Sequence, residues 1–212
     1  MILSAHHRSN LNIFEKKILQ LLLEEDRIIA FPTDTVYGLG VNAYSSRAVQ
    51  AMYDLKKRNE GKAFVLLIDT PEKARPYIAD EELLEKPLLK KHWPGPLTCI
   101  FETKPNIPIY YAKSPINTLG IRIPMHKLLL DLLAFLPFPL ASTSANMSEQ
   151  EPLNDAQSIE TVFNSKEGDQ RLACIIDQGT IIGSPSTVVE LSSSSLKVLR
   201  QGSLNIDHAT FL

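Results

Sequence analysis

The sequence predicts an α/β fold in which a twisted mixed sheet, with parallel and antiparallel strands, is flanked by helices. Segments with helical spacing alternate with short apolar runs of strand length along the whole chain, as in a sheet covered by helices. The last two apolar runs lie close together, which favours some antiparallel pairing. The 212 residues are 44% hydrophobic and 22% charged. The chain can therefore bury a sizeable core, and we expect one domain over residues 1–212.

The individual elements follow in order from this periodicity. Residues 11–25 have apolar side chains at helical spacing, and residues 27–31 form an apolar run that predicts a strand. Residues 46–57 predict a second helix capped by Ser45 or Ser46. Further strands are expected at 63–68, 97–101, 120–123, 173–177, 187–191 and 196–200, with helices at 81–91, 125–135 and 155–163. The serines at 192–195 predict a hairpin loop between the last two strands.

Composition argues against several classes of protein. The most apolar stretch, 128–141, is interrupted by an aspartate and two prolines, whereas a bilayer span needs about 20 apolar residues. No apolar run follows the basic N-terminus as it would in a secretory signal, so we expect a cytoplasmic protein with no membrane contact. Cys99 and Cys174 are expected to be buried thiols.

The histidines predict no metal site. The five of them form no His-x-x-x-His arrangement, and no Cys-x-x-Cys pair accompanies them. His6 and His7 are expected in a mobile N-terminal tail, and the identity of any metal ligand stays open.

The segment Pro32 to Gly40 follows a predicted buried strand, so its hydroxyls would emerge where open α/β sheets usually bind ligands. It matches neither the phosphate loop nor the dinucleotide fingerprint. An ordinary turn is the simpler interpretation of this segment, with a ligand loop as the alternative.

Lys56, Lys57, Arg58 and Lys62 form a cluster of cations at the end of the second predicted helix. Cations there complement the negative end of the helix dipole. The same four side chains could also neutralise a triphosphate, with Arg as a planar fork and Lys as a compact charge. Both interpretations fit the sequence equally well.

Short polar side chains are concentrated at two further places. Residues 140–146 run Leu-Ala-Ser-Thr-Ser-Ala-Asn, which suits close approach to a ligand or, more simply, a loop that caps the next helix. Ser186 and Thr187 precede another predicted strand. Arg122 lies between two isoleucines and points to the opposite face of its strand, where an arginine is normally solvated. Trp93 is expected to be a packing residue.

Six sequence blocks occur in one order along the chain. They are Pro-Thr-Asp-Thr-Val-Tyr-Gly-Leu-Gly from Pro32, Lys-Lys-Arg from Lys56, Trp-Pro-Gly-Pro-Leu-Thr from Trp93, Gly-Ile-Arg-Ile-Pro from Gly120, Ser-Thr-Ser-Ala-Asn from Ser142 and Ser-Thr-Val-Val from Ser186. Together they resemble the YrdC-like (TsaC) family of threonylcarbamoyl-adenylate synthases, in its short single-domain form, from about residue 10 to 205. The resemblance implies a YrdC-like sheet with a large concave ligand-binding face.

The resemblance also implies a reaction. L-threonine, bicarbonate and ATP would give threonylcarbamoyl-adenylate and pyrophosphate, with Mg²⁺ expected alongside ATP. Partner proteins of the t6A-transfer complex would then move the threonylcarbamoyl group to tRNA adenosine 37. Contact with tRNA or double-stranded RNA would be compatible with this role.

The family's functional residues carry over by position. Its Lys-x-Arg and Ser-x-Asn pairs fall on Lys56, Arg58, Ser144 and Asn146, which would be the catalytic set. Threonine would be held by Thr35, Arg122, Ser142 and Ser186, and ATP by Arg58, Lys62, Thr118, Ser144 and Arg200. Two positions depart from the family pattern. Leu67 stands where many members have a histidine that contacts threonine, and residues 147–152 are one residue longer and lack a glycine.

Two other functions would suit such a chain. One is an RNA-binding module without adenylation activity, although a formal charge of −2 argues against nucleic acid as the main ligand. The other is carbamoyl-phosphate-dependent carbamoyl adenylation, which a related domain performs in a larger hydrogenase-maturation protein.

Overall fold

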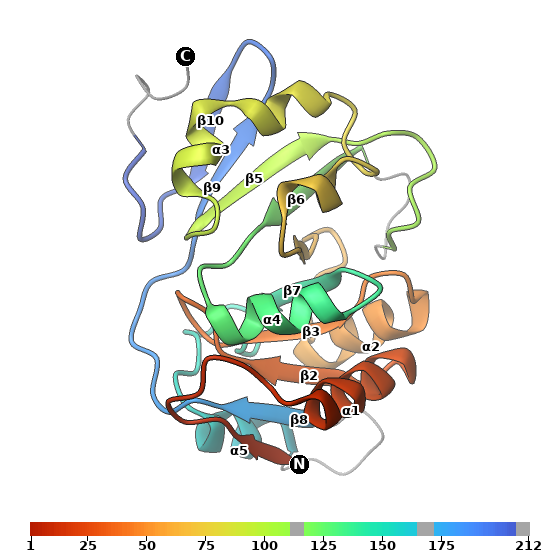
Figure 1. Ribbon diagram of the computed structural model, residues 1–212, viewed down its shortest axis with the longest axis vertical. Coiled ribbons are helices and arrows are strands. Elements are labelled where there is room, and N and C mark those ends of the chain that lie inside the picture. The colour runs from red at the N-terminus through yellow and green to blue at the C-terminus, as the bar shows by residue number, and fades with distance from the viewer. Residues whose placement is uncertain (111–116, 165–171, 207–212) are drawn as a thin grey trace.

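The computed structural model describes residues 1–110, 117–164 and 172–206. Within them the strands are β1 (Ile2–Ser4), β2 (Ile28–Phe31), β3 (Gly38–Asn42), β4 (Val65–Leu67), β5 (Leu97–Glu102), β6 (Thr118–Arg122), β7 (Leu140–Ser144), β8 (Leu172–Asp177), β9 (Thr187–Leu191) and β10 (Leu196–Arg200). All ten belong to one sheet, in the order β1-β8-β2-β3-β7-β4-β6-β5-β9-β10 (Figure 1).

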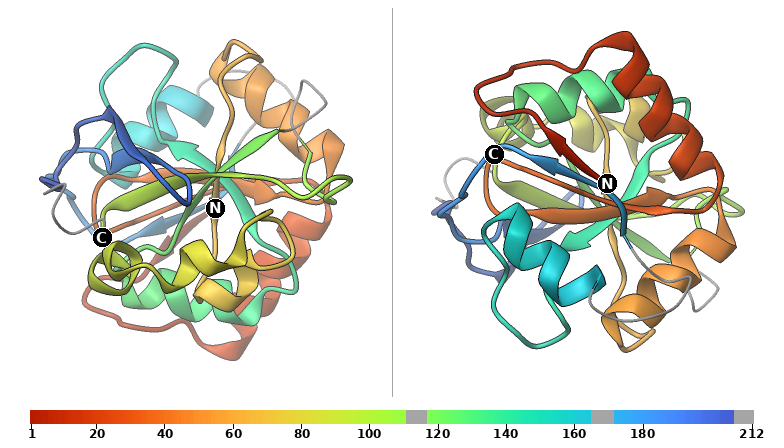
Figure 2. Two further views of the ribbon diagram at one scale, coloured as in Figure 1. Left: turned by 90° about the horizontal axis from the view of Figure 1, so that it is seen from above. Right: turned by 90° about the horizontal axis from the view of Figure 1, so that it is seen from below.

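The predicted mixed sheet is confirmed. β1 and β2 run parallel to β8, β4 runs parallel to β6, and β5 runs parallel to β9. The other neighbours pair antiparallel, including the β9–β10 hairpin that the serine run predicted. Figure 2 looks along the molecule from both ends and shows the strands fanning about a common axis, so the sheet is strongly twisted.

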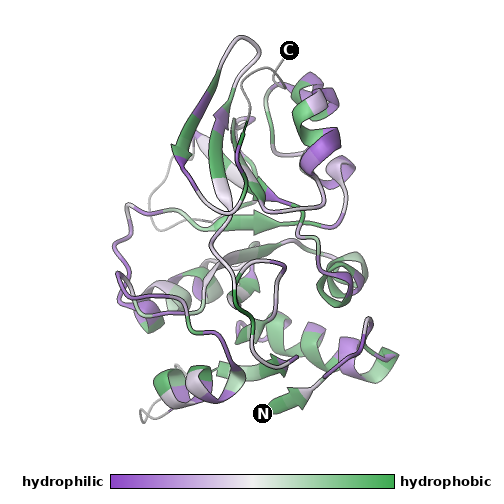
Figure 3. Ribbon diagram, turned by 90° about the vertical axis from the view of Figure 1, so that its left-hand side faces the viewer, coloured by the Kyte–Doolittle hydropathy of each residue, from purple (hydrophilic) through white to green (hydrophobic). Residues whose placement is uncertain are grey.

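Helices cover both faces of this sheet. The α-helices are α1 (Ile13–Glu24), α2 (Ser46–Lys56), α3 (Pro87–His92), α4 (Lys127–Phe135) and α5 (Ala156–Asn164), and short 3₁₀ helices occupy η1 (Pro71–Ala74) and η2 (Glu81–Glu85). One hydrophobic core packs α2, α3 and α5 against the sheet, and a second core packs α1 and α4. In Figure 3 the strands are mainly apolar, whereas polar residues are concentrated in the helices and loops.

Local signals explain where the first two helices begin. Asn12 caps α1 by accepting a hydrogen bond from the Glu15 amide at 3.0 Å, and the Glu15 carboxylate accepts one from the Asn12 amide at 2.8 Å. Ser45 caps α2 through the Ala48 amide, as one of the two predicted caps.

The single helix predicted over 81–91 is wrong. The chain forms η2 and then α3, with Lys86 between them in an extended conformation. Pro87 is the cause, because the residue before a proline avoids helical angles and proline itself suits the first position of a new helix.

Three strands were missed. The loop predicted over 32–40 ends early, because residues 38–42 form β3, and the small residues at 140–144 form β7 instead of a capping loop. The prediction of a mobile N-terminal tail is also wrong, since residues 2–4 pair with β8 and His6 Nε2 lies 3.0 Å from Asp177 Oδ2. His7 follows this anchored residue at the surface.

The Phe31 ring explains why β3 contains two glycines, which made this strand hard to predict from the sequence. A Cβ on Gly38 or Gly40 would lie 2.8 or 2.5 Å from the Phe31 ring. Glycine lets the neighbouring strand pass under that ring, at the cost of the β-branched pattern that predicts strands.

Two further expectations concern cysteines and membranes. Cys99 and Cys174 are buried free thiols, as predicted. Among the described residues, every helix is too short or too polar to cross a bilayer.

Candidate active site

Seven of the predicted site residues line one cavity of about 160 Å³. They are Thr35, Arg58, Arg122, Ser142, Ser144, Ser186 and Arg200. The cavity lies where β3, β7, β4, β6 and β5 run side by side. Residues paired across adjacent strands share a face, and Ser142 is opposite both Gly40 and Val65. The strands thus bring together residues that lie up to 165 positions apart in the sequence.

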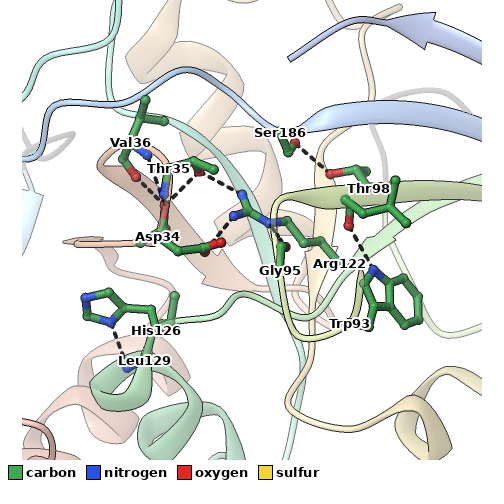
Figure 4. A network of polar contacts seen from close by, with 12 residues as sticks. Asp34, Thr35, Val36, Trp93, Gly95, Thr98, Arg122, His126, Leu129 and Ser186 are labelled. Carbon is green, nitrogen blue, oxygen red and sulfur yellow. Dashed lines mark hydrogen bonds and ion pairs between the residues drawn. The ribbon is translucent and has the colours of Figure 1, made fainter. Parts of the chain in front are cut away.

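Arg122 is buried, contrary to the expectation of a solvated strand arginine. Its side chain is 8% exposed and pairs with Asp34, with 2.6 Å between Nη2 and Oδ1. Nη1 donates to Thr35 Oγ1 at 2.9 Å and Nε donates to the Gly95 carbonyl at 3.0 Å (Figure 4). Burial lowers the pKa of Arg122, and the Asp34 charge opposes that shift. The guanidinium is therefore a fixed cation in the cavity wall.

The loop before β3 is both a turn and part of this wall. Thr33 Oγ1 accepts hydrogen bonds from the amides of Thr35 and Val36 at 3.0 and 3.1 Å, and it donates to the Val36 carbonyl at 2.6 Å. This side-chain turn holds the backbone that presents the Thr35 hydroxyl to Arg122. The two interpretations of this segment, an ordinary turn and a ligand loop, are therefore compatible.

Ser186 is held on the other side of the cavity. Its hydroxyl lies 2.8 Å from the Thr98 hydroxyl, as Figure 4 shows, and its carbonyl accepts from Arg200 Nη2 at 2.8 Å. Trp93 donates its indole N–H to the Leu97 carbonyl and packs edge-on against Phe101, so it is a packing residue as predicted.

Lys56 is almost fully buried, and none of the carboxylates in the described part of the chain forms an ion pair with it. Its ammonium donates to Thr143 Oγ1 at 3.1 Å, to the Ser144 carbonyl at 2.5 Å and to Asn146 Oδ1 at 3.0 Å. These contacts use all three N–H donors. Burial, together with the nearby Arg58 charge, lowers the pKa of Lys56 to about 7. Lys56 therefore organises the end of β7 and the loop after it.

The side chain of Asn146 connects Lys56 to Ser144. Its Oδ1 accepts from both Lys56 and the Ser144 hydroxyl, the latter at 2.7 Å. Its amide nitrogen donates to the Gln150 carbonyl at 2.5 Å. The longer segment 147–152 is thereby folded around Asn146.

Arg58 lies at the border between this cavity and a second one of about 570 Å³. Its Nε donates to the Lys62 carbonyl and its Nη2 to the Ala63 carbonyl, both at 3.0 Å. Burial lowers the pKa of Arg58. Arg58 and Ser144 line both cavities, and the second is also lined by Lys56, Lys57, Asn59, Lys62, Asn146 and residues 147–150. A ligand at this border would meet a guanidinium and a hydroxyl.

Two predicted ATP residues lie outside the first cavity. Lys62 lines only the second, where its ammonium is 3.6 Å from Glu149 Oε1. Thr118 is exposed at the start of β6 and lines neither of the two.

Sequence reasoning missed Thr33 and Thr98, which line the cavity, and Asp34, which is not a lining residue but pairs with Arg122. Asp34, Thr33 and Thr98 hold Thr35, Arg122 and Ser186 in place. The available signal was that all three occur within the six sequence blocks, Thr33 and Asp34 in the one from Pro32 and Thr98 in the one from Trp93. Leu67 lines the cavity beside Arg122, because the two residues pair across β4 and β6.

The described residues include no group of three or more His, Cys, Asp or Glu side chains that could hold a metal ion.

The family model for Sua5, YciO and YrdC, described as telomere recombination, matches residues 21–202. Over 98% of its length this chain is 30% identical to a threonylcarbamoyl-AMP synthase of Pyrococcus abyssi, and over 86% it is 34% identical to that of Bacillus subtilis. It covers 59% and 52% of those relatives, so it spans little more than half of their length.

The solved structures agree with the sequence comparison. The crystal structure of P. abyssi Sua5 complexed with L-threonine superposes with a TM-score of 0.83 at 30% identity, covering 96% of this chain and 58% of that one. Sheet, cavity and family model agree: the chain belongs to the Sua5/YciO/YrdC family.

Proposed function

We propose that this protein is a threonylcarbamoyl-AMP synthase, a nucleotidyltransferase that converts L-threonine, bicarbonate and ATP to threonylcarbamoyl-adenylate and pyrophosphate. The observation that carries the proposal is the shared border of the two cavities. A fixed cation and several hydroxyls line the first cavity, a cluster of cations lines the second, and Arg58 and Ser144 belong to both.

The first cavity suits a small zwitterion. Arg122 offers a guanidinium to a carboxylate, and the hydroxyls of Thr35, Ser142 and Ser186 can donate to or accept from an amine and a hydroxyl. The P. abyssi relative was solved with L-threonine, which supports threonine as the ligand here. Leu67 and Val65 provide an apolar patch for its methyl group.

The second cavity suits the phosphates of ATP. Lys57, Lys62 and Arg58 supply positive charge there, and Arg200 supplies more from the first cavity. Mg²⁺ would arrive with the phosphates and screen their charge. Thr118 stays an expected ATP contact, although neither of these cavities includes it.

The reaction would then occur at the border. The threonine amine and bicarbonate first condense to a carbamate, forming a C–N bond and releasing water. A carbamate oxygen then attacks the α-phosphorus, a new P–O bond forms, and the bond to the β-phosphate breaks to release pyrophosphate. No covalent enzyme nucleophile is needed. Arg58 stabilises charge at the phosphorus. The Ser144 hydroxyl would do so after its O–H turns from Asn146 Oδ1 to the phosphate, while Lys56 and Asn146 hold Ser144 in place.

The other expectations belong to the same proposal. The product would be passed to t6A-transfer proteins for tRNA modification in the cytoplasm. No contact among the described residues specifically favours the RNA-binding alternative.

The test is pyrophosphate release from ATP, measured with and without L-threonine and with and without bicarbonate, and the adenylate product identified by its mass. Release that requires both co-substrates is expected. Release driven by carbamoyl phosphate instead, or RNA binding without any release, would contradict the proposal.

A further inference from the structure

Asp34 belongs to the most deeply buried ion pair among the described residues. Its side chain is 13% exposed and that of Arg122 is 8% exposed, with 2.6 Å between Oδ1 and Nη2. In every other ion pair of the described residues at least one side chain is more than 15% exposed. A buried pair of this kind requires good geometry, because two charges lose their water.

The hydrogen bonds of the guanidinium show what the pair does. An arginine has five N–H groups. One donates to the Gly95 carbonyl, one to Thr35 Oγ1 and one to Asp34. Figure 4 shows the guanidinium held among these three groups. The other two N–H groups make no hydrogen bond within the described part of the chain, and because Arg122 lines the cavity we infer that they can serve a ligand.

Position separates the roles of the two charged residues. Arg122 lines the 160 Å³ cavity, whereas Asp34 is not among its lining residues. A protein carboxylate that lined the cavity would repel the carboxylate of a bound substrate. Asp34 does not line the cavity, so its carboxylate can orient Arg122 without this repulsion. Asp34 follows Thr33, whose side-chain turn fixes the backbone at this point.

We propose that Asp34 is a positioning residue: it directs the two remaining N–H groups of Arg122 toward the α-carboxylate of the amino-acid substrate. The inference rests on the proposed function for the identity of that substrate. Asp34 acts only through Arg122 and does not touch the reacting atoms.

The test compares Asp34→Asn with the wild type in steady-state pyrophosphate release and in calorimetric titration with L-threonine. Asparagine keeps the size and one acceptor oxygen but removes the charge. The KM and the dissociation constant for threonine are expected to rise at least 10-fold, while kcat changes less than threefold and the KM for ATP less than twofold. Asp34→Glu, which keeps the charge on a longer side chain, is expected to recover part of the loss.

Asp131→Asn is the matched control. Asp131 also pairs with a cation, 3.0 Å from Lys16 Nζ, but it lines neither cavity of the proposed active site, so its threonine parameters should stay at wild-type values. Melting curves show whether each variant folds. If Asp34→Asn does not fold, the comparison is made with Asp34→Glu, for which a threefold or larger rise in threonine KM is expected.

The outcomes separate this inference from the proposed function. A wild type that neither binds threonine nor releases pyrophosphate overturns both the function and the substrate named here. The role of Asp34 alone is overturned if the wild type binds threonine and releases pyrophosphate but the folded Asp34 variant behaves in one of two ways. Either its KM for threonine is unchanged, or its KM values for threonine and for ATP rise equally.

Discussion

Arg58 combines a fixed position with a charge that remains available. Two of its N–H groups donate to backbone carbonyls, and the guanidinium lies over the Phe64 ring, with 5.3 Å from the carbon to the ring centre. These contacts fix the side chain before any ligand binds. A cation held in advance stabilises a charged transition state without reorganising.

We expect Arg58→Ala to lower the turnover of adenylate formation by about 10²- to 10³-fold, the usual effect of removing one well-placed donor. The measurement is kcat for pyrophosphate release, with circular dichroism to confirm folding. Arg47→Ala is the control, because Arg47 is 87% exposed on α2 and pairs only with Asp26 among the ion pairs of the described residues. Wild-type turnover in Arg58→Ala would exclude the role.

Lys56 should make stability depend on pH. Its pKa is about 7 in the fold and 10.5 ordinarily, so between these values the unfolded chain binds more protons than the folded one. The free energy of unfolding therefore rises with pH from about 7 to 10.5 through this group, and the gain is lost as pH falls back toward 7.

Urea unfolding at several pH values in this window checks the prediction. The wild type should gain stability with rising pH relative to Lys56→Met, which cannot titrate. Lys17→Met, at an exposed position of α1, should instead follow the wild type. Parallel curves for wild type and Lys56→Met would show that Lys56 keeps its ordinary pKa in the fold.

At the scale of elements, strand alternation decides what the cavity contains. Ser142 and Ser144 are two residues apart on β7, and their β3 partners are Gly40 and Gly38. Residues two apart on a strand share a face, so both serines lie opposite positions without side chains. The glycines that make room for Phe31 thus also leave space beside the serine hydroxyls.

Helix α1 gives a prediction about local stability. Asn12 and Glu15 form a reciprocal capping box, and Glu15 also accepts two hydrogen bonds from Arg8. We expect Asn12→Ala to lower the free energy of unfolding by about 1 kcal/mol, with little effect on the distant cavity. Chemical denaturation measures it, and Asn10→Ala, at an exposed position before the helix, should leave stability unchanged.

At the scale of the whole molecule, the site lies where the two halves of the sheet meet. β7 supplies Ser142 and Ser144 and β3 supplies Gly38 from one half, while β6 and β5 supply Arg122 and Thr98 from the other. β4 lies between them and pairs with both β6 and β7. Forming the cavity therefore requires strands from both halves of the sheet.

We accordingly propose that residues 1–212 unfold as one domain in a single cooperative transition. Trp93, the only tryptophan in the sequence, reports on the part of the sheet around β5, and far-ultraviolet circular dichroism reports on all elements. Their urea midpoints should coincide. Separate midpoints would show that the halves of the sheet unfold independently.

Periodicity predicted the elements that have a strong local pattern. Helices α1, α2, α4 and α5 and most strands lie within a few residues of the expected ranges, since each contains enough apolar residues at the right spacing. β3 and β7 escaped detection because glycines and small polar residues occupy them. β1 escaped because three residues form a strand only when β8 is beside them.

The sequence by itself determined the alternation of elements, the six blocks and hence the family, because local spacing and residue order survive without a fold. Only the tertiary structure decided which candidates meet. It brought Arg58 to Ser144, buried Arg122 against Asp34, and left Thr118 outside both cavities of the proposed site. The physical reason is that burial and ion pairing depend on neighbours supplied by distant strands, which a linear pattern does not record.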